Sequence, residues 1–166
     1  CGIFAKVNAL TDRLLIARLY AASAAGVPIT LVVRGACCLR AGVPGLSSTI
    51  RVYSLIGRLL EHSRIFRFGG PERARYYIGS ADWMSRNLDR RVEVLTPVEE
   101  KHAVMRLERY INRMLSDTVN RWEMQPDGHY ARVAPDGKNV DSQCENRIPD
   151  DLKNEFSILI DNNIKC

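Results

Sequence analysis

Residues 3–33 read IFAKVNALTDRLLIARLYAASAAGVPITLVV, and this stretch decides the class of fold. Ile3–Val7 is a short β-like run, and Ile29–Val33 is almost wholly apolar and β-branched, as in a strand covered on both faces. Thr11 or Asp12 can cap the helix that the apolar spacing between these runs predicts. A strand, a crossover helix and a second strand imply parallel pairing. We therefore expect an α/β domain built on a mixed β-sheet flanked by α-helices.

Arg34 follows the second strand of this unit directly. It therefore stands at the carboxyl end of a parallel strand, which is the edge where ligands collect in open α/β sheets. A loop rich in Gly and Pro, residues 37–48, comes next, and loops of this length in compact domains are often functional. Arg34 is accordingly a candidate binding residue.

A second stretch carries the remaining polar candidates. In LLEHSRIFRF, residues 59–68, His62 and Arg64 are two apart, so both side chains point to one side of the expected strand. Ser80 follows a glycine after a second strand-like run, and Asn87 lies just beyond. Phosphoryl transfer can use all of these groups: an imidazole that titrates near neutral pH, a guanidinium, backbone N–H groups around Ser80, and an amide. The alternative is a hydrogen-bonded histidine beside an ordinary turn and cap.

Composition narrows the class of protein. The 166 residues are 46% hydrophobic and 26% charged, which fits one soluble domain with a core of its own. The net charge is +5, and every permanently cationic residue between positions 34 and 91 is arginine. This excess predicts a polyanionic partner, the alternative being a solvated basic face. The five cysteines lack metal-ligand spacing and are expected to be buried, reduced thiols.

The pattern beyond the first unit predicts further elements. We expect further strands at residues 50–53, in the run that ends at 68, and at residues 75–78 and 92–95. A short helical turn is expected at residues 55–60. Thr96, Pro97 and Glu99 form a capping-box signature for a helix. Residues 122–125 and 129–133 flank a Pro-Asp-Gly turn and predict a hairpin. The apolar stripe of the predicted helix consists of Val104, Leu107, Ile111 and Met114.

Four long runs make the sequence similar to a known family: AKVNAL, AASAAGVPITLVVRGACCLRAGVPGLS, IRVYSLIGRLLEHSRIF and YIGSADWMSRNLDRRVEVLTPV. They resemble the C-terminal catalytic domain of bacterial polyphosphate kinase, closely over about residues 3–100 and more weakly as far as the DSQ stretch at 141–143. That family has phospholipase D-like domains, whose HxK…GS…N pattern the present HxR…GSxDWM…N resembles, with Arg64 in place of Lys. The resemblance implies a phospholipase D-like lobe over residues 1–140, with 141–166 as its C-terminal tail or helix.

The same resemblance implies an activity, the reversible transfer of the terminal phosphate of ATP to inorganic polyphosphate with Mg²⁺. It implies that His62 assists proton transfer, that Arg34 contacts nucleotide phosphates, and that Arg64, Ser80 and Asn87 bind ATP or phosphate. The implied partners are ATP, ADP, polyphosphate, the remaining domains of the kinase and further copies of the enzyme; nucleic acid is not expected. The expected location is the cytoplasm, with membrane association left open.

The resemblance also implies that the active site is divided. The histidine that becomes phosphorylated belongs to the preceding domain of the family, and this sequence has no such HHP-type motif. The chain lacks an initiator Met, so we expect an excised piece, inactive alone, with the Mg²⁺ ligands in the missing part and no metal site of its own.

Two other functions fit the residues. One is a dimeric phospholipase D-like phosphodiesterase or nuclease in which each subunit supplies one histidine, although Arg64 stands where those enzymes use Lys. The other is a non-enzymatic module that binds polyanions.

Overall fold

The computed structural model describes residues 2–70, 73–133, 137 and 139–143. At its centre lies the expected unit, formed by β1 (Ile3–Val7), α1 (Arg13–Ala24) and β2 (Ile29–Val33). The two strands are parallel, with Ile3 opposite Ile29 and Val7 opposite Val33. The predicted βαβ unit is confirmed.

Asp12 is the residue that caps α1. Its carboxylate accepts a hydrogen bond of 2.8 Å from the Leu15 backbone N–H, one of the groups that a helix start leaves without a partner. Its second oxygen accepts a bond of 2.7 Å from the Ser85 hydroxyl, which ties α1 to the start of α2 (Ser85–Arg90). These two bonds hold the pKa of Asp12 below its usual range, and the bond from Leu15 has the larger effect.

The sheet is mixed, as expected. Within the described residues its strand order is β6-β5-β4-β1-β2-β3-β7-β8. The pairs β1–β2 and β2–β3 are parallel, whereas the other five pairs are antiparallel. The further strands are β3 (Ile50–Leu55), β4 (Ile65–Phe68), β5 (Arg75–Gly79), β6 (Leu95–Val98), β7 (Arg121–Met124) and β8 (Tyr130–Arg132).

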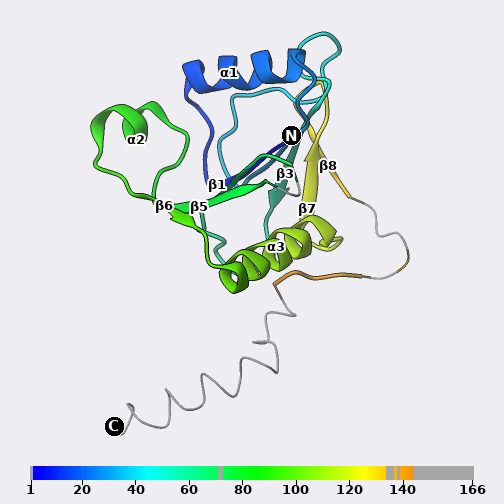
Figure 1. Ribbon diagram of the computed structural model, residues 1–166. Helices are drawn as coiled ribbons and strands as arrows, with labels where there is room; N and C mark the ends of the chain where they lie inside the picture. The colour runs from blue at the N-terminus through cyan, green and yellow to red at the C-terminus, as the bar shows by residue number, and fades with distance from the viewer. Residues whose placement is uncertain (1, 71–72, 134–136, 138, 144–166) are drawn as a thin grey trace, which may run out of the picture.

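Helices cover both faces of the sheet (Figure 1). Side chains on one face of β1 and β2 pack with Ile16 and Leu19 of α1. On the other face Phe4 and Val32 pack with α3 (Lys101–Ser116). The predicted apolar stripe of this helix is confirmed, because all four of its members belong to that cluster: Val104, Leu107, Ile111 and Met114. Successive residues of β1 therefore point alternately toward α1 and toward α3.

Two predictions about the segment before β4 are wrong. Residues 55–60 form no helical turn, because Leu55 still belongs to β3 and the chain then runs irregularly. His62 and Arg64 do not lie on a strand, because β4 begins only at Ile65. The Arg64 carbonyl still accepts from the Gly79 N–H of β5, but the His62 backbone must be held in another way.

The start of the second long helix was also predicted wrongly. Residues 95–98 pair with β5 as strand β6, so Thr96 and Pro97 lie in a strand and not in a cap. Glu100 is the N-cap instead, and its carboxylate accepts from the backbone N–H groups of His102, at 2.8 Å, and Ala103, at 2.6 Å. The predicted strand at 92–95 is also wrong for residues 92–94, because the strand begins at Leu95 and ends at Val98, before the Glu100 cap.

The C-terminal part of the described chain forms one edge of the sheet and the segment that follows it. The predicted hairpin is confirmed as β7 and β8. Ser142 and Gln143 are buried, and Asp117 accepts bonds from the Ser142 backbone N–H, at 2.8 Å, and from its hydroxyl. Residues 144–166 of the expected tail or helix, which was placed at 141–166, lie outside the described residues. No helix in the part of the chain that the structure describes is long and apolar enough to cross a membrane.

Candidate active site at the carboxyl edge of the sheet

The topology brings the ends of four strands to one edge of the sheet. Asn8 and Arg34 directly follow the parallel strands β1 and β2. Strand β4 runs antiparallel to β1, with Ile65 opposite Lys6, so the residues before β4 lie beside the end of β1. Strand β5 runs antiparallel to β4, so the residues after Gly79 reach the same edge. The sequence candidates therefore meet where the fold predicts a ligand.

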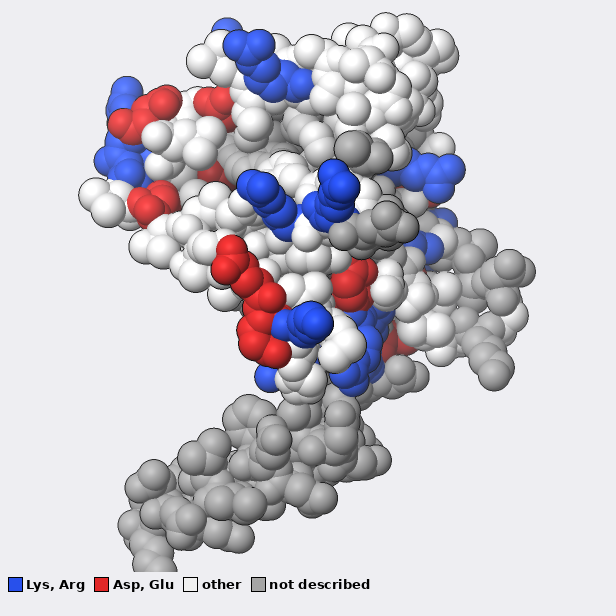
Figure 2. Space-filling view, viewed as in Figure 1, with Lys and Arg blue, Asp and Glu red and all other residues white. Residues whose placement is uncertain are grey.

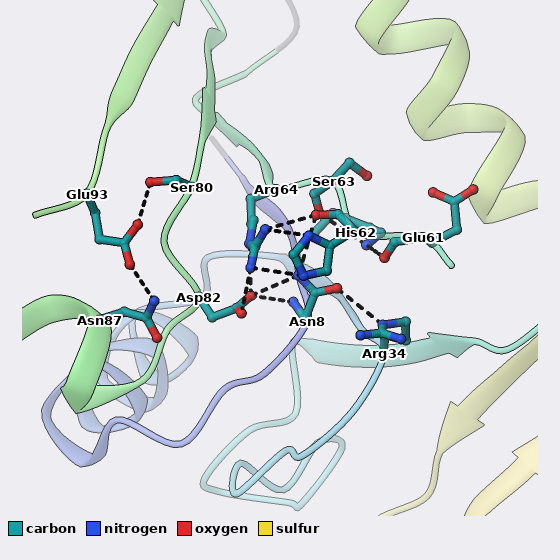
Figure 3. A network of polar contacts seen from close by, with 11 residues as sticks. Asn8, Arg34, Glu61, His62, Ser63, Arg64, Ser80, Asp82, Asn87 and Glu93 are labelled. Atoms are coloured by element: carbon teal, nitrogen blue, oxygen red, sulfur yellow. Dashed lines mark hydrogen bonds and ion pairs between the residues drawn. The ribbon is translucent and has the colours of Figure 1, made fainter. Parts of the chain in front are cut away.

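His62, Arg64 and Asp82 form the centre of the site (Figure 3). Arg64 and Asp82 form a two-point ion pair, with Nε to Oδ1 at 3.2 Å and Nη2 to Oδ2 at 2.9 Å. Both side chains are about nine-tenths buried, at 13% and 10% exposure. Arg64 Nη1 lies 3.0 Å from Nδ1 of His62. The guanidinium thus links a buried carboxylate to the imidazole.

The contact with Arg64 restricts the imidazole. A guanidinium has only donors, so Nδ1, the nearer ring nitrogen at 3.0 Å from Nη1, accepts when the ring hydrogen lies on Nε2, which itself lies 3.5 Å from Nη2. In this arrangement His62 is able to donate a hydrogen bond from Nε2 to a phosphate oxygen. To take up a proton at Nε2, the ring must first release Arg64.

Asn8 connects this centre to Arg34. The Asn8 backbone N–H and Nδ2 both donate to Oδ1 of Asp82, at 2.7 and 3.2 Å. Asn8 Oδ1 accepts from Nε of Arg34 at 3.2 Å. Burial raises the pKa of Asp82, but the bonds from Arg64 and Asn8 outweigh it and hold that pKa below its usual range. Asp82 therefore stays a carboxylate that orients both candidate cations.

Ser80 and Asn87 form a second group, to one side of the first in Figure 3. The Ser80 hydroxyl and Asn87 Nδ2 both donate to the carboxylate of Glu93, the second at 2.5 Å. These bonds lower the pKa of Glu93, and the bond from Ser80 has the larger effect. Asn87 is buried, and its Oδ1 has no hydrogen-bond partner among the described residues.

Two of the backbone N–H groups near Ser80 are not free to form the predicted anion-binding concavity. Gly79 N–H donates to Arg64 O at 3.2 Å, and Ser80 N–H donates to Val94 O at 3.0 Å. Both groups are therefore occupied by sheet-like pairing.

Sequence reasoning missed four residues of the site, and two had left a signal. Lys6 interrupts the apolar run of β1 at a position where only apolar side chains are expected, and Asp82 lies in the same GSxD motif as Ser80. Asn8 and Glu93 had no local pattern of their own. Their roles depend on which strands are neighbours, and spacing along the chain does not show this.

The concentration of arginine is less continuous than the sequence suggests. Arg64 is paired with Asp82, and Arg67 forms an ion pair of 2.9 Å with Glu108. On the face seen in Figure 2, Lys and Arg gather in small groups with Asp and Glu between them. The cations that are best placed to bind an anion are therefore the few at the carboxyl edge of the sheet.

No metal centre is formed by the described residues. Among them, no group of three or more His, Cys, Asp or Glu side chains is placed to hold a metal ion. Cys37 is a half-buried free thiol whose pKa is raised by burial. Cys38 is also free but exposed, so the expectation of buried thiols is wrong for Cys38. It follows Cys37 directly and faces away from the core.

The fold defines the class of protein first. NucT from Helicobacter pylori, a phospholipase D-like protein, superimposes with a TM-score of 0.52 over 69% of this chain and 78% of NucT. At 12% sequence identity this likeness shows the fold alone. The chain is thus a phospholipase D-like α/β lobe, as the sequence predicted.

The family follows from closer matches. The family described as polyphosphate kinase C-terminal domain 2 matches residues 1–143. The polyphosphate kinase of Thermosynechococcus vestitus is 57% identical over 80% of this chain, and that of Pseudomonas putida is 48% identical over 92%. The crystal structure of polyphosphate kinase from Porphyromonas gingivalis matches 86% of the chain with a TM-score of 0.82 at 36% identity. The chain belongs to the polyphosphate kinase C-terminal domain family.

The chain is much shorter than these relatives. It spans 18% and 21% of the two curated kinases and 22% of the crystallised one.

Proposed function

We propose that this chain forms the C-terminal catalytic lobe of a polyphosphate kinase, which transfers the terminal phosphate of ATP reversibly to inorganic polyphosphate. The observation that carries the proposal is the meeting of Arg34, His62 and Arg64 at one sheet edge in a chain of this family. Phosphoryl transfer needs mainly positioning, neutralisation of phosphate charge and proton management. The three side chains supply groups for each task.

Arg34 is proposed to bind nucleotide phosphates. Asn8 holds only its Nε, and within the described part of the chain no hydrogen bond uses its terminal nitrogens. A planar fork fixed at one nitrogen presents the other two to phosphate oxygens in a set direction. Arg64, which Asp82 holds from the other side, is proposed to add positive charge beside the transferred group.

His62 is proposed to assist proton transfer at the oxygen that leaves or attacks. Its ring contacts Arg64, so a phosphate bound beside the ring would draw Arg64 toward itself. Release of the contact between Arg64 and Nδ1 frees the imidazole to change tautomer. General acid–base help of this kind is worth about 10²–10⁴ in rate.

Ser80 and Asn87 are proposed as further phosphate-binding side chains. Both are bonded to Glu93 here, so an anion at this position must break those bonds. The Mg²⁺ of the reaction is proposed to be held by the rest of the kinase, since the described residues offer no ligand cluster. ATP, ADP, polyphosphate, the other kinase domains and further copies are the proposed partners, in the cytoplasm.

The test is polyphosphate synthesis by a full-length kinase that carries this chain. His62→Ala should keep the fold and lower kcat by about 10²-fold or more. Arg34→Ala should chiefly raise the apparent KM for ATP. The matched controls are His102→Ala and Arg18→Ala, whose side chains are exposed on helices away from the site, and both should behave as the parent enzyme.

Two results would contradict the proposal. Synthesis at a near-parental rate by His62→Ala would remove the histidine from the mechanism, and an unchanged KM for Arg34→Ala would remove that arginine from ATP binding. Assays on a phosphodiester substrate, and on binding of nucleic acid, test the diesterase and polyanion-binding alternatives with the same proteins.

A further inference from the structure

Lys6 is a fully buried cation in the middle of the sheet. It lies on β1 between β2 and β4, and the alternation along the strand directs it, like Phe4, toward the face covered by α3. Burying an ammonium costs several kcal/mol unless the protein supplies acceptors, so an apolar residue would be the ordinary choice here. Its presence requires a reason.

The acceptors of Lys6 are two backbone carbonyls on either side of the candidate catalytic histidine. Its Nζ donates to Glu61 O at 2.9 Å and to Ser63 O at 3.1 Å. The intervening carbonyl, that of His62, accepts from Arg64 Nη1 at 3.1 Å and from Asn8 Nδ2 at 3.5 Å. Three successive carbonyls are thus bound by donors from side chains.

These bonds replace the sheet pairing that the segment lacks. Residues 61–63 precede β4 and belong to no strand, so their carbonyls have no partner in the ladder. Burial is the main cause that lowers the pKa of Lys6 to about 8; Glu61 and Asp82 oppose this change, whereas Arg34 and Arg64 add to it. Even as a neutral amine Lys6 has two N–H groups, one for each carbonyl.

We infer that Lys6 is a positioning residue, which bridges the backbone on both sides of His62 and so fixes the place of the imidazole relative to the transferred phosphoryl group. The inference rests on the proposed function of His62. A displacement of about 1 Å at a reacting centre can cost about 10²-fold in rate. Arg34 lies after a different strand and its Nε is held by Asn8, so nucleotide binding should depend little on the bridge.

The experiment uses the full-length kinase that carries this chain. Lys6→Met, which fills the space without donors, should lower kcat for polyphosphate synthesis by about 10-fold to 10²-fold and leave the apparent KM for ATP within about twofold. Hydrogen–deuterium exchange should become faster in the peptide spanning residues 59–64 and stay unchanged in α1 and β2. Lys101→Met, at an exposed position, is the matched control and should match the parent enzyme in both measurements.

The outcomes separate this inference from the proposed function. Parental kcat and parental exchange in Lys6→Met, beside an inactive His62→Ala, overturn the positioning role alone. Parental activity in both variants overturns the proposed function as well. If Lys6→Met does not fold, Lys6→Gln, which is too short to bridge both carbonyls, should show the same selective loss of kcat. A parental kcat for a folded Lys6→Gln overturns the inference.

Discussion

Asp82 is the residue through which the parts of the candidate site are joined. Its two oxygens accept four hydrogen bonds, from the backbone and amide of Asn8 and from two nitrogens of Arg64. Arg64 in turn contacts His62, and Asn8 holds Arg34. The orientation of three charged or titratable groups therefore depends on one buried carboxylate.

Replacing Asp82 by Asn should destabilise the fold. The change leaves the Arg64 guanidinium about nine-tenths buried without its anion, and breaking a buried ion pair on one side costs about 3–5 kcal/mol. We expect the free energy of unfolding, measured by urea denaturation, to fall by about that amount. Asp127→Asn, which removes an exposed carboxylate on the β7–β8 turn, should change it by less than about 0.5 kcal/mol. Equal stability of Asp82→Asn and the parent chain would show that the pair contributes little.

A second prediction concerns Lys6 and the pH dependence of the free energy of unfolding. The pKa of Lys6 is about 8 in the folded chain against 10.5 for an ordinary lysine, so between these values the unfolded chain binds more protons than the folded one. Stability therefore rises with pH across this window, by up to about 3 kcal/mol. Urea denaturation near pH 8 and near pH 10 measures the rise, and Lys6→Met should lack it. Parallel pH dependences of the two proteins would contradict the lowered pKa.

At the scale of the elements, the sequence predicted the βαβ unit, the hairpin and the core stripe of α3 because each follows from a local pattern. Thr96 to Glu99 also made a good local pattern for a helix start, but pairing with β5 placed Thr96, Pro97 and Val98 in a strand. The sequence placed His62 and Arg64 together, yet only the fold revealed Asp82, Asn8 and Lys6 as their partners, because those contacts join residues far apart along the chain.

The irregular segment after β3 is held by the end of the described chain. Gln143 donates from Nε2 to Leu59 O at 2.9 Å and accepts from Leu59 N–H at 2.8 Å. A Cβ at position 57 would come within 2.4 Å of Gln143 Oε1, so glycine allows this close approach. The DSQ stretch, which began as the weak end of the family resemblance, thus holds the segment that leads to His62.

Gln143→Ala should loosen this segment. It removes two hydrogen bonds worth about 1 kcal/mol each, so the free energy of unfolding should fall by about 1–3 kcal/mol. The Leu59 amide should exchange with solvent at least about tenfold faster. The matched control is Gln125→Ala, whose side chain donates only to the nearby Glu123 O, at 3.2 Å, and it should leave Leu59 unaffected. Unchanged exchange at Leu59 would mean that the segment is held by other contacts.

At the scale of the whole molecule, the site is open on one side. The residues just before His62 expose large apolar side chains, with Ile56 at 62% and Leu60 at 68% exposure. The chain spans about one fifth of the length of two curated relatives, 18% of one and 21% of the other. A phosphoryl-transfer site works best when water is excluded, so under the proposed function we expect another part of the kinase to cover this exposed histidine segment and its apolar neighbours.

The lobe alone should therefore bind its polyanion without turning it over. Long-chain polyphosphate should bind through Arg34 and the neighbouring cations, with an affinity that falls about tenfold or more between 50 and 200 mM salt because the contacts are electrostatic. No polyphosphate should form from ATP until the remaining domains of the kinase are added as a separate chain. Synthesis should then appear with the parent lobe and stay absent with its His62→Ala variant, which binds polyphosphate as well. Turnover of ATP by the isolated lobe would contradict the divided site, since every group needed for the reaction would then lie within this one chain.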